Sequence, residues 1–384
     1  MIYLDNNAST PLDPDVWRAM AAAATVHGNA SSVHAEGQKA RRTVEESRES
    51  IARLLGARPD EVFLTSGGTE SNAMAIFGAA AGRSGRVVIS GAEHPSVREA
   101  AARLAASGCE VVTVAPERSG ALDPGRVLEA VTPGTLLVSV MAANNEYGGL
   151  YPVPAIAAEV RRRGALFHTD AVQMAGRLPL DAAAWDVDML SASAHKMHGP
   201  KGAGALYVRR GVRLAPHTPG GGQERRQRAG TENTLAIVGF GAAARLARER
   251  LSTDPAEVGR LRDRLERGIL EKIPGTRAIG SDAPRVPNTS ALLFEGVSGE
   301  ALLVRLDLEG VAVSVGSACS SGTLAPSPAL LSLGLSREEA RSVVRFSLSR
   351  MTREEEIRRV LELLPEAVGA ARGAAALAGA RDGS

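Results

Sequence analysis

Short apolar runs alternate with helix-period segments along most of this chain, and this alternation restricts the folds that it can adopt. The apolarity within each run is continuous, which fits strands that are buried on both faces. The predicted strands span residues 61–66, 86–90, 110–114, 135–141, 165–170, 188–194 and 204–210. Helices are predicted between them, among others at 35–56, 96–108 and 152–164, each closed by a glycine. The pattern predicts an α/β fold with a mainly parallel seven-stranded sheet flanked by helices.

A smaller α+β unit is expected after this sheet. Residues 231–252 read as one long helix, which ends at the sequence STDPAE. Beyond this break, the predicted strands are 288–296, 311–316 and 343–349, and helices are predicted around 298–309 and 353–371. We therefore predict a large domain over 15–252 and a small domain made of 1–14 and 253–384. The Ala/Gly-rich end of the chain is expected to fray.

Composition excludes several classes of function. The chain has 384 residues, of which 44% are hydrophobic and 23% are charged, as in an ordinary globular protein. Its formal charge is +2 and its aromatic content is 3%. It therefore has neither the excess of positive charge that attracts a phosphate backbone nor the aromatic side chains on which bases stack. We also expect no signal peptide, since no basic stretch leads into an apolar segment after Met1, and no apolar run is long enough to span a membrane. We therefore expect a cytoplasmic protein that binds neither nucleic acid nor membranes.

A glycine turn that opens a helix is the first candidate binding site. In the sequence TSGGTESN (65–72), a predicted strand is followed by Gly67, Gly68 and Thr69. Backbone N–H groups at such a helix start can bind an anion such as a phosphate. A plain glycine turn explains the stretch equally well. It is not a Walker loop, because no Gly-Lys-Ser/Thr follows.

The next predicted strand end carries a carboxylate. Asp170 stands at the carboxyl end of the strand 165–170, where open α/β sheets bind ligands, and Gln173 follows it. A buried carboxylate needs a cationic or hydrogen-bonding partner, since burying it alone costs several kcal/mol. A helix N-cap is the alternative role for Asp170.

A third strand end carries a lysine. In SAHKMHGPKG (193–202), Lys196 and Lys201 are the candidates for a desolvated amine that can form a Schiff base. The two other lysines of the chain, Lys39 and Lys272, lie on charged stretches of helical period. A metal site is the rival interpretation, but the histidines here lack the helix and glutamate of a zincin pattern. We therefore predict no metal.

An anion site, a strand-end carboxylate and a strand-end lysine together match the needs of pyridoxal 5′-phosphate. The phosphate needs donors, the pyridine nitrogen needs a carboxylate that keeps it protonated, and the aldehyde needs an amine. The combination is far more specific than any of its parts.

With these features the chain resembles the cysteine desulfurases, which belong to the class V aminotransferase group of fold type I pyridoxal-phosphate enzymes. The similarity runs from YLDNNAST (3–10) to VRFSLSR (344–350). The motifs between these ends occur in the order of the family: GNASSVH (28–34), TSGGTESN (65–72), EHPSV (93–97), NNEYG (144–148), HTDAVQ (168–173), SAHKMHGPKG (193–202), GGGQERRQRAGTEN (220–233) and GSACSSG (316–322).

The resemblance implies a role for each matching residue around the cofactor ring. Lys196 would bind the aldehyde as a Schiff base, and Asp170 would pair with the pyridine nitrogen. Gln173 would donate a hydrogen bond to the phenolic oxygen. His94 would stack on the ring and move protons, and Asn145 would lie beside the ring.

The resemblance also implies how the phosphate and the substrate are held. The backbone at Gly68 would bind the phosphate together with Thr69, Ser193 and His195. Thr231 would reach the same phosphate from the partner subunit, so we expect a homodimer. Arg345 would bind the carboxylate of the substrate L-cysteine with its planar fork.

Cys319 decides the type of chemistry. In GSACSSG it could be a buried structural cysteine, but its small polar neighbours also suit a mobile thiolate. The resemblance implies that Cys319, on a loop at about 316–334, takes the sulfur of L-cysteine as a persulfide and that alanine is released. The length of this loop is similar to that of the branch that supplies iron–sulfur cluster assembly through a sulfur-acceptor protein. Cys109 precedes a predicted strand, where we expect an inert thiol.

Two alternatives stay open. A selenocysteine lyase or a cystine-cleaving lyase of the same fold would share the cofactor site but depend less on Cys319. A non-catalytic sulfur carrier or cofactor-binding protein is the rival from another class, and turnover of cysteine to alanine would exclude it.

Overall fold

A seven-stranded sheet forms the centre of the computed structural model, which describes residues 1–316 and 325–382. Its strands are β2 (Val62–Thr65), β3 (Arg86–Ser90), β4 (Glu110–Val114), β5 (Thr135–Ser139), β6 (Leu166–Asp170), β7 (Met189–Ser193) and β8 (Gly204–Val208). They lie in the order β2-β8-β7-β6-β5-β3-β4. The pairs from β4 through β7 are parallel, whereas β8 runs antiparallel to both of its neighbours. The predicted mainly parallel seven-stranded sheet is confirmed.

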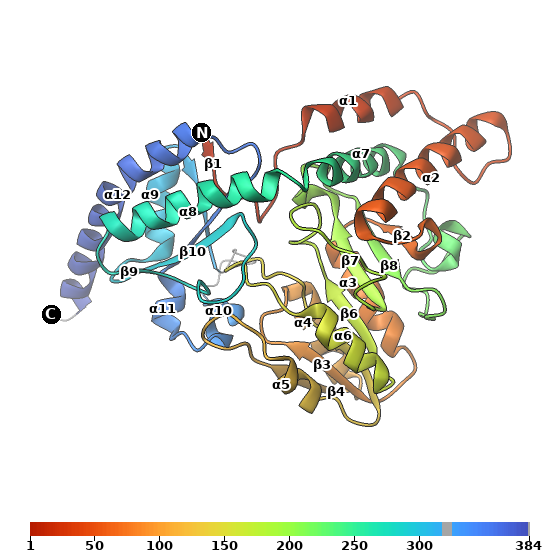
Figure 1. Cartoon of the computed structure of the whole chain (residues 1–384), viewed down its shortest axis with the longest axis horizontal. Helices are drawn as coiled ribbons and strands as arrows, with labels where there is room; N and C mark the ends of the chain where they lie inside the picture. Colours follow the sequence, from red (N-terminus) through yellow and green to blue (C-terminus); the bar gives the residue numbers. More distant parts are fainter. Residues whose placement is uncertain (317–324, 383–384) are drawn as a thin grey trace.

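Helices cover both faces of this sheet (Figure 1). They are α1 (Pro14–Ala23), α2 (Ala35–Leu55), α3 (Gly68–Ala80), α4 (Pro95–Ala106), α5 (Pro124–Glu129), α6 (Val153–Arg162) and α7 (Thr234–Arg250). In β3, Val88 belongs to one buried cluster, while Val87 and Ile89 belong to a cluster on the opposite face. Because both faces are buried, apolar residues follow one another along such a strand, and this explains the continuous runs in the sequence.

A second, antiparallel sheet follows, with strand order β12-β13-β10-β9. Its strands are β9 (Thr276–Ala278), β10 (Thr289–Phe294), β12 (Ser314–Val315) and β13 (Val343–Ser347). The N-terminal strand β1 (Ile2–Tyr3) pairs with β11 (Val311–Ala312) beside it. The accompanying helices are α8 (Asp254–Lys272), α9 (Gly299–Leu308), α10 (Pro328–Ser332), α11 (Arg337–Arg341) and α12 (Glu354–Asp382). Figure 1 shows α8, α9 and α12 grouped around this sheet, with the N-terminus among them.

The domain division at 14/15 and 252/253 stays a prediction. In its favour, one buried cluster consists of Leu4 and residues between 258 and 371. However, Ala291, Leu293 and Leu330 join the core of the large sheet, so the two parts share buried contacts.

Three details differ from the sequence-based prediction. The helix α8 was missed, although Val258, Leu261, Leu265 and Ile269 are buried at helical spacing. The predicted strand 311–316 is split, because β11 pairs with β1 while β12 pairs with β13. Expecting the last helix to end near residue 371 was wrong, since α12 continues to Asp382. Alanine has the highest helix propensity, and it dominates this stretch.

A buried ion pair fixes the glycine-rich segment that precedes α7. Arg48 of α2 donates two hydrogen bonds to Glu224, at 2.7 and 2.8 Å, and both side chains are less than a tenth exposed. Glu224 also accepts a hydrogen bond from the backbone N–H of Leu64 in β2. The pair therefore connects α2 and β2 to the segment that carries Thr231.

Replacing Glu224 by alanine should lower the free energy of unfolding by about 3–5 kcal/mol, because it leaves the buried charge of Arg48 without its main partner. Urea unfolding measures this change. Glu45, the half-exposed second partner of Arg48, is the control, and E45A should cost less than about 1 kcal/mol. Equal costs for the two variants would contradict this view of the ion pair.

Candidate active site

A cavity lies at the carboxyl ends of the parallel strands, the edge where open α/β sheets bind ligands. Its empty volume is about 710 Å³. We call it the strand-end cavity. Nine of the predicted site residues line it: Gly68, Thr69, His94, Asn145, Asp170, Gln173, Ser193, His195 and Lys196.

The other predicted site residues lie elsewhere. Thr231 is exposed and does not line the cavity within its own chain. Arg345 lies just outside the wall and donates a hydrogen bond of 2.9 Å to the backbone oxygen of Asn145. Cys319 is outside the described residues. Cys109 is buried in the core cluster beside α4.

The N-terminus of α3 forms one end of the cavity. Its N-cap residue, Gly67, provides no side-chain cap, and Gly68 and Thr69 open the helix. The N–H groups of a first helical turn have no intrahelical acceptor, so they can bind an anion. A close backbone contact shapes this end, because a Cβ on Gly204 of β8 would lie 2.5 Å from the Cα of Gly67.

Asp170 is held by neutral donors. Its Oδ2 accepts a hydrogen bond of 2.7 Å from Asn72, and its Oδ1 accepts one of 2.9 Å from the backbone N–H of Val172. It is only 4% exposed and has no cationic side chain within ion-pair distance among the described residues. The carboxylate therefore suits a cationic ligand group inside the cavity.

His94 caps α4, and this contact assigns its tautomer. Its Nδ1 accepts a hydrogen bond of 3.1 Å from the backbone N–H of Ser96 and lies 2.8 Å from the Oγ of the same residue. Burial lowers the pKa of His94, against an opposing effect of Asp170. In the neutral ring the proton consequently resides on Nε2, which is left to act as a donor.

Lys196 follows β7 and rests on backbone oxygens. Its Nζ donates hydrogen bonds to the carbonyl oxygens of Asn7 and of Ala8, the latter at 2.8 Å. Burial lowers the pKa of Lys196 to about 7, with further contributions from Arg177 and Arg345. A substantial fraction of this amine is therefore uncharged at neutral pH. Lys201, the second candidate in the sequence, is exposed and outside the cavity wall.

The other predicted residues of the cavity are Gln173, His195 and Ser193. Gln173 donates a hydrogen bond of 3.0 Å to the carbonyl oxygen of Asn7. Nδ1 of His195 lies 3.3 Å from the Oγ of Ser9, and burial lowers the pKa of His195 to about 4. The ring of His195 is thus neutral at pH 7 and offers a hydrogen bond instead of a charge. Ser193 lines the same end of the cavity as Thr69.

Four residues that support this site have no predicted role from the sequence. Asn72 orients Asp170 and lies one helical turn after Thr69, so its spacing was a usable signal. Glu93, directly before His94, is 2% exposed, and burial raises its pKa to about 8. Asn7 and Arg177 contact Lys196. Asn7 lies in the motif YLDNNAST, in which no residue was given a role, whereas no local pattern identified Arg177.

Glu93 joins two of the loops that form the cavity. Its Oε1 accepts hydrogen bonds of 2.5 Å from the Oγ of Ser90 and 2.7 Å from the backbone N–H of Met141. Its Oε2 is buried and has no hydrogen-bond partner among the described residues. Because His94 follows Glu93 and Met141 lines the cavity, this carboxyl group sets the distance between the ends of β3 and β5.

Comparison with known proteins supports the resemblance seen in the sequence. The sequence model of the family described as "Aminotransferase class-V" matches residues 2–360. The chain is 45% identical to a cysteine desulfurase of Sinorhizobium fredii over 372 residues, which are 96% of each protein. It is 44% identical to a cysteine desulfurase of a Nostoc species over 371 residues, 96% of this chain and 93% of that protein.

Solved structures show the same fold. A NifS-like protein superposes with a TM-score of 0.89 at 34% identity, over 96% of this chain and 99% of its own. A second structure, titled as SspA in complex with cysteine, gives a TM-score of 0.82 at 34% identity, over 91% of this chain and 99% of its own. No helix among the described residues is both long and apolar enough to span a membrane.

The protonated state of Glu93 predicts a pH dependence of stability. Since its pKa is raised in the folded protein from 4.5 to about 8, the folded state retains a proton that the unfolded state releases between these values. Raising the pH through this window should therefore destabilise the wild type, by at most about 1.4 kcal/mol per pH unit. Glu93→Gln, which mimics the neutral carboxyl group, should remove this contribution. Urea unfolding from pH 5 to 8 checks it, and parallel curves for the two proteins would contradict the assignment.

Proposed function

The chain belongs to the aminotransferase class-V family, in the group of the cysteine desulfurases, and we propose that it transfers the sulfur of L-cysteine to Cys319 by means of Lys196. The family depends on pyridoxal 5′-phosphate. The observation that carries the proposal is the strand-end cavity, where an amine with a lowered pKa shares one space with the carboxylate of Asp170 and an uncapped helix start.

The residues of the cavity fit the three polar groups of this cofactor. The N-terminus of α3, with Thr69, Ser193 and His195, would hold the phosphate. Asp170 would pair with the pyridine nitrogen, because no cationic side chain among the described residues neutralises it. Gln173 would donate to the phenolic oxygen.

Lys196 would hold the aldehyde carbon covalently, and the uncharged fraction of its amine at neutral pH makes this possible. When bound, pyridoxal 5′-phosphate supplies an electron sink that stabilises negative charge at the Cα of the substrate. Once the substrate amine has displaced it, the Lys196 amine can accept the Cα proton. Its pKa of about 7 suits a general base near neutral pH.

His94 would supply a proton rather than take one. Its Nδ1 is engaged by the N–H of Ser96, so its Nε2–H is the group available to the substrate. The thiol of Cys319 must therefore lose its proton to another acceptor, such as the substrate itself.

Arg345 would bind the substrate carboxylate. Its Nη2 donates a hydrogen bond of 2.6 Å to Asp5 and its Nη1 binds the backbone of Asn145. Its Nε is buried and has no acceptor among the described residues. Two of the five N–H groups of the guanidinium thus bind described residues, which leaves donors for an incoming carboxylate close to Asn145.

The sulfur step would take place at Cys319. Its thiolate attacks the sulfur of the substrate, so that an S–S bond forms while the bond between sulfur and Cβ breaks. The electron pair of the broken bond stays with the carbon skeleton, which takes up protons and leaves as alanine. The enzyme is left with a persulfide on Cys319.

We further propose that the protein works as a homodimer and passes the persulfide sulfur to an acceptor protein for iron–sulfur clusters or other thio-cofactors. The exposure of Thr231, outside the cavity of its own chain, supports a role of this residue in the cavity of a second copy. The motif around Cys319 supports the link to cluster assembly through its resemblance to that branch of the family. The cytoplasmic location stays a prediction from the sequence.

Lys196→Ala should abolish the visible absorption of tightly held pyridoxal 5′-phosphate after dialysis, because the variant has no amine in the cavity. Lys201→Ala, the matched control, should keep the absorption. Covalent retention of the cofactor by the Lys196 variant after borohydride reduction would disprove the assignment.

Cys319→Ser should separate cofactor chemistry from sulfur chemistry. Added L-cysteine should still change the absorption of the bound cofactor, since this needs Lys196 but no enzyme thiol. Formation of alanine and of persulfide should both collapse, because a serine hydroxyl is a poor nucleophile towards sulfur. Cys109→Ser should behave as the wild type. Release of alanine by the Cys319 variant at the wild-type rate would favour the selenocysteine or cystine lyase instead.

A further inference from the structure

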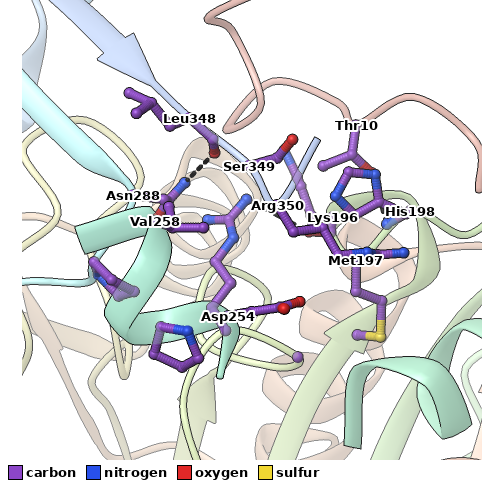
Figure 2. Close-up of a pocket in the computed structure, with 14 residues that line it drawn as sticks. Thr10, Lys196, Met197, His198, Asp254, Val258, Asn288, Leu348, Ser349 and Arg350 are labelled. Carbon is purple, nitrogen blue, oxygen red and sulfur yellow. Dashed lines mark hydrogen bonds between the residues drawn. The ribbon is translucent and has the colours of Figure 1, made fainter. Parts of the chain in front are cut away.

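A second pocket lies behind Lys196, on the side away from the strand-end cavity. It has about 420 Å³ of empty volume and is formed where the N-terminal segment meets α8 and the end of β13. Figure 2 shows Thr10 and His198 across this pocket from Asn288 and Leu348. Arg177 lines this pocket together with Lys196 and does not line the strand-end cavity.

Within the part of the chain that the structure describes, Arg177 binds only neutral acceptors. Its Nη1 donates to the Oδ1 of Asn7 at 2.9 Å and to the backbone and side-chain oxygens of Gln173. Its Nη2 donates to the carbonyl oxygen of Asn6 at 3.0 Å and reaches that of Lys196 at 3.5 Å. No carboxylate of the described residues lies within ion-pair distance of this guanidinium. Its positive charge is therefore not compensated locally.

The segment that Arg177 holds is the one that receives the lysine amine. The carbonyl oxygen of Asn7 accepts hydrogen bonds from Nζ of Lys196 and from Nε2 of Gln173. The carbonyl oxygen of Ala8 accepts a further bond from the amine at 2.8 Å. By fixing Asn6 and Asn7, the guanidinium fork fixes the position of these acceptors.

We propose that Arg177 is a positioning residue for Lys196, which clamps the Asn6–Asn7 segment under the amine and sets an uncompensated positive charge behind it. The inference rests on the proposed role of Lys196 as the cofactor-binding lysine. It assigns two separable contributions to one side chain: the fork holds the acceptors, and the charge disfavours protonation of the amine.

The electrostatics of the amine agree with this geometry. Burial makes the largest contribution to the lowered pKa of Lys196, and among the charged neighbours Arg177 contributes most. The other charged and titratable groups that interact with the amine are Arg345 of β13, Asp170 of β6, Asp5 of the N-terminal segment, His94 before α4 and the adjacent His195. Arg345 acts in the same direction as Arg177, while Asp170 and Asp5 raise the pKa of Lys196.

The test is the pH dependence of cofactor capture by the apoprotein, which does not require turnover. The rate at which added pyridoxal 5′-phosphate becomes covalently bound should rise with pH through a midpoint near 7 in the wild type, where the amine loses its proton. In Arg177→Gln the midpoint should move upward by about one pH unit or more. In Arg177→Lys, which keeps the charge but lacks the fork, the midpoint should stay within about half a unit while the plateau rate falls about fivefold.

Asn7→Asp serves as a second variant, in case Arg177→Gln does not fold. This substitution places a carboxylate next to the guanidinium of Arg177 and keeps the Oδ1 acceptor that Arg177 uses. It should also raise the pH midpoint of cofactor capture. A wild-type midpoint in either folded variant would overturn the charge contribution, and a wild-type plateau rate in Arg177→Lys would overturn the fork. Lys196→Ala is the negative control. If this variant captures the cofactor like the wild type, the proposed function is wrong, whereas loss of capture in this variant agrees with that function.

Discussion

Asn7 joins the two sheets of this protein at the point where its chemistry is proposed to take place. Its Oδ1 accepts hydrogen bonds from Arg177 and Asn288, and its Nδ2 donates to Thr289 and to the backbone of Asn145. Its backbone N–H donates to Ser347. The residue is 1% exposed, so each of these bonds replaces one that water would make in the unfolded chain. One asparagine thus ties the ends of β5 and β6 to β10 and β13.

This junction explains how a lysine at a strand end can remain both enclosed and reactive. The amine of Lys196 is stabilised by carbonyl dipoles of Asn7 and Ala8 instead of by a carboxylate. A carboxylate in that place would keep the amine protonated. Arg177 and Arg345 act on this amine, and Asp170, across the cavity, has no cationic side chain of the described residues within ion-pair distance. The carboxylate of Asp170 therefore has to be neutralised by a bound ligand and not by a side chain of the protein.

The sequence predicted the parts of this arrangement that depend on local patterns. Apolar runs predicted all seven strands of the large sheet, because strands buried on both faces are rich in consecutive apolar residues. Strand ends carrying Asp170 and Lys196 predicted the edge at which the cavity lies. Asn7 and Arg177 could not be predicted in this way, since their roles arise from contacts between segments more than a hundred residues apart. The split of the strand 311–316 follows likewise from its two pairing partners, which no local pattern encodes.

The central claim is that the sulfur of L-cysteine leaves the strand-end cavity on Cys319. A single turnover of the full-length holoenzyme with sulfur-labelled L-cysteine, followed by peptide mass spectrometry, tests it most directly. We expect one labelled sulfur atom on the peptide that contains Cys319, none on the peptide that contains Cys109, and one alanine for each labelled peptide. Formation of alanine without labelled sulfur on Cys319 would contradict it.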